Sequence, residues 1–449
     1  MNSACNGKPF RALLYMRKNR IDIITLGCSK NLIDSERLLK RFSDLGFEVA
    51  HDSDNVCGAT IVINTCGFIG DAKEESINTI LEYVEAKKEH RIERLYVMGC
   101  LSERYRKELE AEIPEVDKFY GKFDWNSIID ELKKSVPTTK SYDRIITTPK
   151  HHAYIKIAEV CNRFCAFCAI PIITGRYKSR SIDEILDEVK MLVGRGVKEF
   201  NVIAQDLSSY GIDLYGEMKL AELIDTMANV DGVEWIRLHY AYPSQFPYDI
   251  LPVIRKHDNV CKYIDVALQH ISDNVLNAMH RHINKEETLQ FIRRLREEVP
   301  GIHIRTTLMV GFPGEGEEEF NELLQFVKDV RFDRMGAFAY CEEDDTYAAK
   351  NYDDTIPEEV KQERLSKLMA LQESIALSLN ETKINTVQKV IVDREEPDYY
   401  VGRTQFDSPE VDPEVLIKKT RKLAIGQFYN VAIKEAMPFE LIGEVAIND

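Results

Sequence analysis

Short apolar runs alternate with amphipathic stretches over most of this chain. Before residue 121 the pattern occurs three times: an aliphatic run, a turn with one cysteine, and a stretch with apolar residues at intervals of three and four. The three runs are IDIITLG at 21–27, ATIVINT at 59–65 and RLYVMG at 94–99. This alternation predicts βα units, which build a parallel sheet that binds ligands outside the carboxyl ends of its strands.

The alternation resumes at Ala153, and the pattern changes again near residue 390. The six apolar runs of the middle region are YIKIAEV, EFNVIA, WIRLHYA, YIDVAL, HIRTTLMV and MGAFAY. Six successive βα units predict a partial (βα)6 barrel with its chemistry on the loops that follow the strands. The last region carries VIVD, YYVGRTQF, VLIKK, FYNVAIKEA and ELIGEVAI with turn residues between them, which predicts a small β-barrel.

The predicted fold class is therefore α/β, with domains at 21–135, 150–380 and 383–449. A chain of 449 residues is too long for one ordinary core. Residues 1–20 are expected to form a disordered tail, because they lack the hydrophobic segment and cleavage site of a leader, and Met16 is an alternative start of translation. No apolar run approaches the roughly twenty residues of a membrane span, so we expect a soluble, cytoplasmic protein.

The charge balance narrows the class of partner. The chain has 59 Lys and Arg against 75 Asp and Glu, a formal net charge of -16. Such a charge opposes loose adhesion to nucleic acid or to an anionic membrane. A protein partner is favoured, and a basic one in particular.

The ten cysteines indicate metal or redox chemistry, because disulfide frameworks are rare in cytosolic chains of this size. Cys28, Cys66 and Cys100 each occupy a strand-to-helix turn of the first domain. Parallel strands end at one edge, so we expect the three thiols to meet there, near helix N-termini that favour thiolates. The alternative is three unrelated buried cysteines. Four others are interpreted as structural: Cys5 in the tail, Cys57 in a polar turn, and Cys261 and Cys341 as small buried hydrophobes.

A second cysteine group lies in EVCNRFCAFC at 159–168, directly after the first strand of the partial barrel. A structural zinc site needs four ligands, and neither a second cysteine pair nor a histidine pair lies nearby, since His151 and His152 precede the strand. Three thiolates on a cubane cluster leave one iron without a protein ligand. An open metal position is what a catalytic site needs to bind a substrate.

This spacing resembles the motif of the radical S-adenosylmethionine (SAM) superfamily, carried here by Cys161, Cys165 and Cys168, and Phe167 also fits it. The resemblance implies a 4Fe–4S cluster whose unique iron chelates SAM and cleaves it to a 5'-deoxyadenosyl radical. That radical removes a hydrogen from an unactivated carbon, a step beyond general-base catalysis, so the cofactor carries the difficult chemistry.

Further segments resemble the methylthiotransferase family of that superfamily. They are LGCSKNLIDSE, INTCGFI, MGC, IPIITGRYKSR, AQDLSSYG, HYAYP, DVALQHISDNVLNAMHR and VGFPGE. The resemblance implies a second, auxiliary 4Fe–4S cluster on Cys28, Cys66 and Cys100. It also implies that one SAM methylates a sulfur on that cluster while another generates the radical, which requires the two cysteine groups to share a cleft.

The resemblance also places SAM contacts at Gln205, after the second strand of the partial barrel, and at Val310 and Gly311, which end its fifth strand. The alternative for these positions is a helix cap and a tight turn. The chain departs from the family pattern at Thr174, where family members usually have arginine before the glycine. Arg176 and Arg180 are candidates to replace that arginine.

The GCSKNLIDSE segment is similar to family members that modify the β-carbon of an aspartate in ribosomal protein uS12, whereas tRNA-modifying members tend to have GCQMN. The last domain resembles a TRAM domain, yet from Lys383 onward it has nine Lys and Arg against twelve Asp and Glu. An acidic barrel suits a basic ribosomal protein better than RNA. The KKTRK run at 418–422 is an alternative RNA patch, and the excess acidity could be only a solvated surface.

The resemblance therefore implies uS12 or the small ribosomal subunit as substrate partner, and an electron donor such as flavodoxin or ferredoxin. One alternative is a tRNA methylthiotransferase that acts on N6-isopentenyladenosine or threonylcarbamoyladenosine. Another is an iron–sulfur carrier without enzymatic activity, which would need the clusters but not the adenosine pocket.

Overall fold

The structure, a computed structural model, describes residues 18–53, 56–132 and 140–446. The chain divides into two compact units, which we describe separately. The first comprises Met1–Thr147 and Ala169–Arg176, and the second comprises Thr148–Cys168 and Tyr177–Asp449. The predicted tail lies outside the described residues as far as residue 17, and so do Cys5 and Met16. The domain boundaries expected from the sequence stay a prediction.

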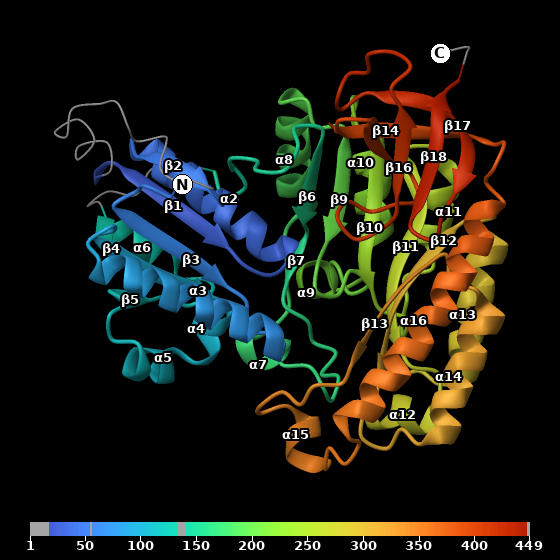
Figure 1. Ribbon diagram of the computed structural model, residues 1–449, viewed down its shortest axis with the longest axis horizontal. Helices are drawn as coiled ribbons and strands as arrows, with labels where there is room; N and C mark the ends of the chain where they lie inside the picture. Colours follow the sequence, from blue (N-terminus) through green and yellow to red (C-terminus); the bar gives the residue numbers. More distant parts are fainter. Residues whose placement is uncertain (1–17, 54–55, 133–139, 447–449) are drawn as a thin grey trace. The chain divides into compact units, whose positions relative to one another are not determined.

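The first unit is built on a five-stranded parallel sheet with the strand order β2-β1-β3-β4-β5 (Figure 1). Its strands are β1 (Arg20–Thr25), β2 (Glu48–His51), β3 (Thr60–Thr65), β4 (Arg94–Gly99) and β5 (Lys118–Phe119). The three strands expected from the apolar runs are β1, β3 and β4. The two edge strands, β2 and β5, are shorter and less apolar and were not predicted.

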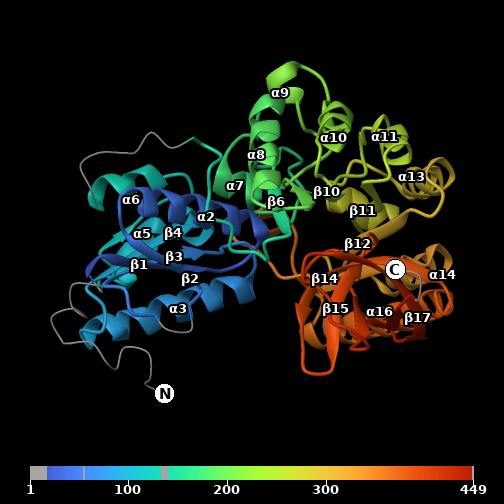
Figure 2. The ribbon, with the colours of Figure 1, turned by 90° about the horizontal axis from the view of Figure 1, so that it is seen from above.

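Helices cover both faces of this sheet (Figure 2). The helices of the unit are α2 (Ser29–Asp44), α3 (Gly70–Lys88), α4 (Cys100–Arg104), α5 (Arg106–Glu112), α6 (Trp125–Leu132) and α7 (Ile170–Thr174). Successive residues of a strand point to opposite faces. Ile61 and Ile63 of β3 therefore pack with α3 and α5, whereas Val62 packs with α2 and α6.

The second unit contains a six-stranded parallel sheet whose strands follow one another in chain order. They are β6 (His152–Lys156), β9 (Glu199–Ile203), β10 (Trp235–Ala241), β11 (Val260–Gln269), β12 (His303–Val310) and β13 (Arg334–Ala339). β7 (Ala158–Glu159) and β8 (Lys178–Ser179) form a separate, two-stranded antiparallel sheet. The expected run of six βα units is confirmed.

The long helices of the second unit lie side by side along the outer face of this sheet (Figure 2). Its helices are α8 (Ile182–Gly194), α9 (Ile212–Tyr215), α10 (Leu220–Ala228), α11 (Ile250–Lys256), α12 (Asp273–Ala278), α13 (Lys285–Glu298), α14 (Glu317–Val330), α15 (Tyr347–Asn351) and α16 (Glu358–Glu381). The loops after the strands are thus left to form the functional end of the sheet.

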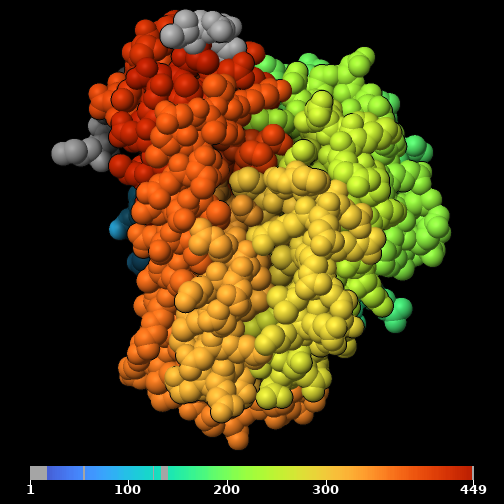
Figure 3. Space-filling model, turned by 90° about the vertical axis from the view of Figure 1, so that its right-hand side faces the viewer, coloured from blue at the N-terminus to red at the C-terminus, as the bar shows by residue number. Residues whose placement is uncertain are grey.

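The C-terminal region forms a closed five-stranded barrel in the order β14-β15-β16-β18-β17, as its strand pattern predicted. Its strands are β14 (Val387–Glu395), β15 (Tyr399–Thr404), β16 (Glu414–Lys418), β17 (Phe428–Ala436) and β18 (Glu440–Val445). In the space-filling view the barrel packs directly against the rest of the second unit (Figure 3).

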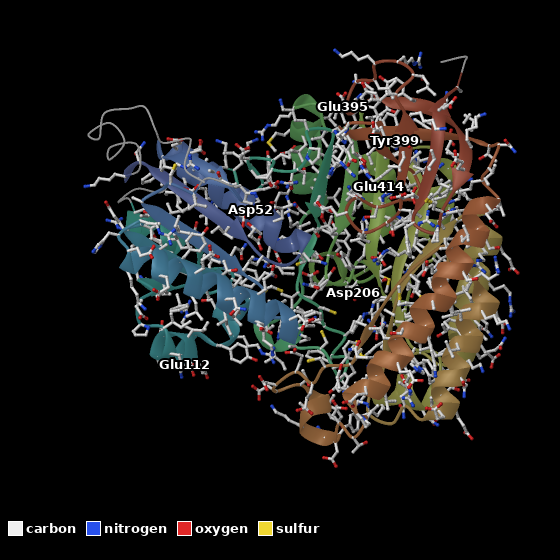
Figure 4. The ribbon with its side chains drawn as sticks, viewed as in Figure 1. Asp52, Glu112, Asp206, Glu395, Tyr399 and Glu414 are labelled. Carbon is white, nitrogen blue, oxygen red and sulfur yellow. The ribbon has the colours of Figure 1, made fainter. Side chains whose placement is uncertain are left out.

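Buried ion pairs fix the barrel to the amino-terminal ends of the sheet strands. Glu199, the first residue of β9, accepts hydrogen bonds from Arg403 of the barrel at 2.7 Å and from Arg237 of β10 at 3.0 Å. Arg334 of β13 pairs with Asp407 at 2.5 Å. Asp206, which follows β9, lies at the other end of the sheet from the labelled barrel residues (Figure 4). The barrel therefore closes the end of the sheet that is away from the functional loops.

Within the described ranges, no helix combines the length and the apolar character needed to cross a membrane.

Candidate functional site

The first cysteine group lies where three neighbouring strands of the first unit end. Cys28 caps the N-terminus of α2 after β1, Cys66 follows β3 directly, and Cys100 is the first residue of α4 after β4. Because β1, β3 and β4 are adjacent and parallel, the three turns lie at one edge of the sheet. The structure thus brings these cysteines together as the sequence predicted.

The backbone turns that carry these thiols are in close contact. A Cβ added to Gly27, which has a φ of +92°, would lie 2.7 Å from the Cys66 Cβ and 2.9 Å from its Sγ. A Cβ on Gly67 would lie 2.7 Å from the Leu101 backbone. Only glycine fits at such approaches, so the glycines beside the cysteines let the three turns converge.

Asn31 of α2 connects all three turns, and sequence reasoning missed it. Its Nδ2 donates to the carbonyl oxygens of Leu26 at 3.0 Å and Thr65 at 3.1 Å. Its Oδ1 lies 3.8 Å from the Sγ of Cys100, which donates to it. The CSKN segment was the available signal, since a polar side chain one turn into a helix can reach the neighbouring strand ends.

The three thiols differ in their electrostatics. Desolvation acts to raise the pKa of Cys28, but the charge of Lys30 and hydrogen bonds from nearby backbone N–H groups lower it below the ordinary value. Burial raises the pKa of Cys66 and raises that of Cys100 to about 12. Cys28 is therefore the thiol of this group that ionises most readily.

The second cysteine group occupies the loop after β6 and β7. Cys161, Cys165 and Cys168 are partly buried, and the backbone N–H of Cys168 donates to the Cys165 carbonyl at 3.0 Å. Two residues of the loop, Val160 and Phe164, have φ values of +68° and +50°. Such conformations are uncommon outside glycine and persist where the surroundings hold them.

Hydrogen bonds from elsewhere in the second unit hold this loop. The Nε of Arg163 donates to the buried carboxylate of Asp206 at 2.6 Å, and its backbone N–H donates to the Sγ of Cys161 at 3.4 Å. The Nη1 of Arg281 donates to the Sγ of Cys165 at 3.1 Å. Desolvation, followed by the charge of Asp206, raises the pKa of Cys161 to about 12. Asp206 and Arg281 were not predicted as partners of this loop, although they lie in the AQD and MHR segments.

The residues expected to contact SAM lie after strands of the same sheet. Val310 is the last residue of β12, and Gly311 has a φ of +74° and donates its N–H to Glu315 at 3.0 Å. The ring of Phe167 packs edge-on against Phe312, with centroids 6.4 Å apart. Gly311 thus forms the tight turn that was the alternative interpretation, and the same turn brings its neighbour Phe312 against the cysteine loop.

Gln205 lies two residues after β9 and is partly buried. Arg176 and Arg180, the two candidates to replace the family arginine that is absent at Thr174, differ in their contacts and exposure. Arg180 forms an ion pair with buried Glu188 at 2.7 Å and donates to the Lys156 carbonyl, whereas Arg176 is exposed. Arg180 therefore has a structural role already, which favours Arg176.

The donor chemistry of both cysteine groups, three thiols in each, fits a 4Fe–4S cluster. In the part of the chain that the structure describes, no three His, Cys, Asp or Glu side chains are placed as the ligands of one metal ion. A 4Fe–4S cluster takes thiolates on separate irons, so its ligands lie farther apart than those of one zinc ion. Three thiols per group suit that arrangement.

The remaining cysteines are partly as expected. Cys261 is fully buried beside Trp235 and Tyr263, which fits its interpretation as a small hydrophobe. Cys341 is exposed, so the same interpretation was wrong for it, because its strand ends at Ala339 and the chain reaches the surface after the buried Tyr340.

Family comparisons agree with this architecture. The chain matches the Radical SAM superfamily at residues 155–327, the Uncharacterized protein family UPF0004 at 20–121, and the TRAM domain at 384–446. The six-stranded sheet, with a three-cysteine loop after its first strand, thus defines a radical SAM protein.

Two relatives are similar over almost the whole chain. The ribosomal protein uS12 methylthiotransferase RimO of Phocaeicola vulgatus is 63% identical over 431 residues, which cover 96% of this chain and 100% of that protein. The protein of the same name from Parabacteroides distasonis is 60% identical over 430 residues, with the same coverage of both chains. This chain belongs to the RimO family of radical SAM methylthiotransferases.

Among solved structures, the chain is similar to the radical SAM methyltransferase TsrM from Kitasatospora setae, whose structure has cobalamin and a [4Fe-4S] cluster bound. The TM-score is 0.55 at 14% sequence identity, covering 91% of this chain and 84% of that chain. At this identity the likeness concerns the fold alone.

Proposed function

We propose that this chain adds a methylthio group to the β-carbon of an aspartate in ribosomal protein uS12. The observation that carries the proposal is the identity of 59–63% to seven uS12 methylthiotransferases over 96% of the chain. The convergence of three cysteines at one sheet edge supports it, since sulfur insertion needs a second cluster beside the one that cleaves SAM.

In this proposal Cys28, Cys66 and Cys100 hold the auxiliary 4Fe–4S cluster, and Cys161, Cys165 and Cys168 hold the cluster that binds SAM. Phe167, Gln205, Val310 and Gly311 contact SAM. When bound, the clusters and SAM supply the radical that removes hydrogen from the substrate carbon and the methylthio group that replaces it.

The chain's own residues orient these groups. Asn31 holds the turns after β1 and β3 in register through its hydrogen bonds to Leu26 and Thr65. In the second unit the Arg163–Asp206 pair fixes the cysteine loop to the residues after β9. The apolar contact between Phe167 and Phe312 excludes water from one side of that loop.

The surface of the barrel favours a protein substrate. The basic run at 418–422 faces acidic neighbours: Lys419 pairs with Glu395 at 2.8 Å, and Lys418 lies 3.7 Å from Glu435. Such pairs reduce the positive charge available to an RNA backbone. A basic ribosomal protein, alone or in the small subunit, suits the overall charge of -16. The proposal also includes an electron donor such as flavodoxin or ferredoxin and a cytoplasmic location.

The substrate is tested by mass spectrometry of uS12 and tRNA from a deletion strain of the source organism. Loss of a methylthio mass on a uS12 aspartate, with tRNA unchanged, is expected. Loss of the methylthio mass from a tRNA adenosine, with uS12 unchanged, would instead show that the chain is a tRNA methylthiotransferase.

The radical step is tested by incubating the reduced, reconstituted protein with SAM under anaerobic conditions. Formation of 5'-deoxyadenosine is expected. If protein with a full iron content formed no 5'-deoxyadenosine, the proposed radical chemistry would be excluded, and the alternative of an iron–sulfur carrier would be favoured.

A further inference from the structure

Arg281 is a buried cation with an unusual set of partners. Its side chain is 3% exposed. Its Nη1 donates to the Cys165 Sγ at 3.1 Å, and its Nη2 donates to the carbonyl oxygen of Ala267. Its guanidinium lies 4.2 Å from the centroid of the Tyr242 ring. All of these groups belong to the second unit.

Within the described residues, no carboxylate forms an ion pair with Arg281, and its buried Nε has no hydrogen-bond partner. A second guanidinium, that of Arg163, lies 4.3 Å from the same Tyr242 ring, but Asp206 neutralises it at 2.6 Å. Burying a charge is unfavourable unless an opposite charge accompanies it. Among the partners of Arg281, the Sγ of Cys165, at 3.1 Å, is the one that belongs to a proposed cluster ligand.

The backbone holds Arg281 firmly in this position. His280 and His282, on either side of it, have φ values of +56° and +53°. The Tyr242 hydroxyl donates to the Arg281 carbonyl at 2.8 Å, and the Arg281 N–H donates to Leu276 at 3.0 Å. Two left-handed residues around one buried arginine are a local strain of a kind that proteins retain at functional positions.

We propose that Arg281 is a positioning residue that raises the reduction potential of the cluster bound by Cys161, Cys165 and Cys168. The inference rests on the proposed function, because it takes Cys165 as a cluster ligand. Hydrogen bonds to the cluster sulfurs and nearby charge set the potential of such clusters. A one-electron reduction makes the cluster more negative, so a cation and donor at its thiolate favour the reduced form.

The test uses the full chain with Cys28, Cys66 and Cys100 replaced by Ala, so that only one cluster forms. Its midpoint potential is measured by dithionite titration followed by electron paramagnetic resonance. R281M and R281Q both remove the charge, and R281K restores it. The matched control is R294M, which removes an arginine that also lies over a tyrosine ring, at 3.7 Å from the Tyr248 centroid, without a sulfur contact.

We expect the ratio of reduced to oxidised cluster at a fixed potential to fall about tenfold in R281M and R281Q, a shift of about 59 mV for a one-electron couple. R281K should recover most of this shift, and R294M should match the parent. An unchanged midpoint potential in iron-loaded R281M or R281Q would overturn this inference but leave the proposed function intact. A parent chain that binds no iron would overturn the proposed function and the inference together.

Discussion

Neutralising Glu199 should destabilise the second unit strongly. This carboxylate is fully buried between Arg237 and Arg403. Desolvation acts to raise its pKa, but the charges of the two arginines lower it from 4.5 to about 2. At about 1.4 kcal/mol per pH unit, that difference corresponds to about 3 kcal/mol of stability. Breaking a buried ion pair by removing one partner costs about 3–5 kcal/mol, which agrees. E199Q should therefore lose about 3 kcal/mol.

The assay is urea unfolding followed by tryptophan fluorescence at neutral pH. The chain has two tryptophans, and W125F leaves Trp235, whose ring lies 4.8 Å from that of Phe428 in the barrel. The control is E395Q, because Glu395 forms an exposed ion pair with Lys419, a kind of pair worth at most about 1 kcal/mol. Equal unfolding free energies for E199Q and E395Q would refute the reasoning.

The pH dependence gives a second check on the same residue. A carboxyl whose pKa is lowered by folding contributes its stability fully above the unfolded pKa, near 4.5, and loses it as the pH falls through about 2. The difference in stability between the parent and E199Q should accordingly be constant from pH 7 to 5 and shrink below about 4.5. A difference that stays constant down to pH 3 would show that the carboxylate charge is not its source.

Four further substitutions, with one control variant, test the proposed cluster and SAM sites. C161A should abolish 5'-deoxyadenosine formation, whereas C28A should still cleave SAM but transfer no methylthio group; unchanged iron content in either variant would contradict the ligand assignment. G27A should reduce the iron content from about eight to about four atoms per chain, because the added Cβ would clash with Cys66. The control is G46A: Gly46 has a similar φ of +84° and nothing within 4 Å of an added Cβ, so this variant should keep the full iron content. G311A forces a side chain into a turn with a φ of +74° beside Lys361, and should raise the KM for SAM about tenfold, measured through 5'-deoxyadenosine formation; an unchanged KM would remove Gly311 from the SAM site.

The elements that could be predicted from the sequence are those whose hydrophobic pattern lies within one short continuous stretch of residues. Strands such as β1, β3 and β4 are continuous apolar runs, and the cysteine after each was placed correctly because parallel strands end at one edge. The edge strands β2 and β5 were missed, since their residues are half polar and their pairing depends on a partner strand. The closed barrel was also predicted, from evenly spaced short strands and turns.

The partners of the cysteines could not be predicted. Arg281 lies 116 residues from Cys165 and Asp206 lies 43 from Arg163, so these contacts depend on which strands become neighbours. The exposure of Cys341 was missed for the same reason, because an apolar strand beside a residue does not fix where the chain turns. The expectation that the two cysteine groups share a cleft stays a prediction.

The position of α7 limits where the chain can be truncated without exposing apolar side chains. This helix directly continues the loop that ends at Cys168, yet it packs in the first unit, where Ala169 and Ile173 contact Cys100. A shortened chain that starts near residue 148 would leave those apolar side chains without their packing surface, one peptide bond from a proposed cluster ligand. Spectra of the SAM-binding cluster should therefore be recorded on the full-length polypeptide, with the other cluster removed by substitution instead of by truncation.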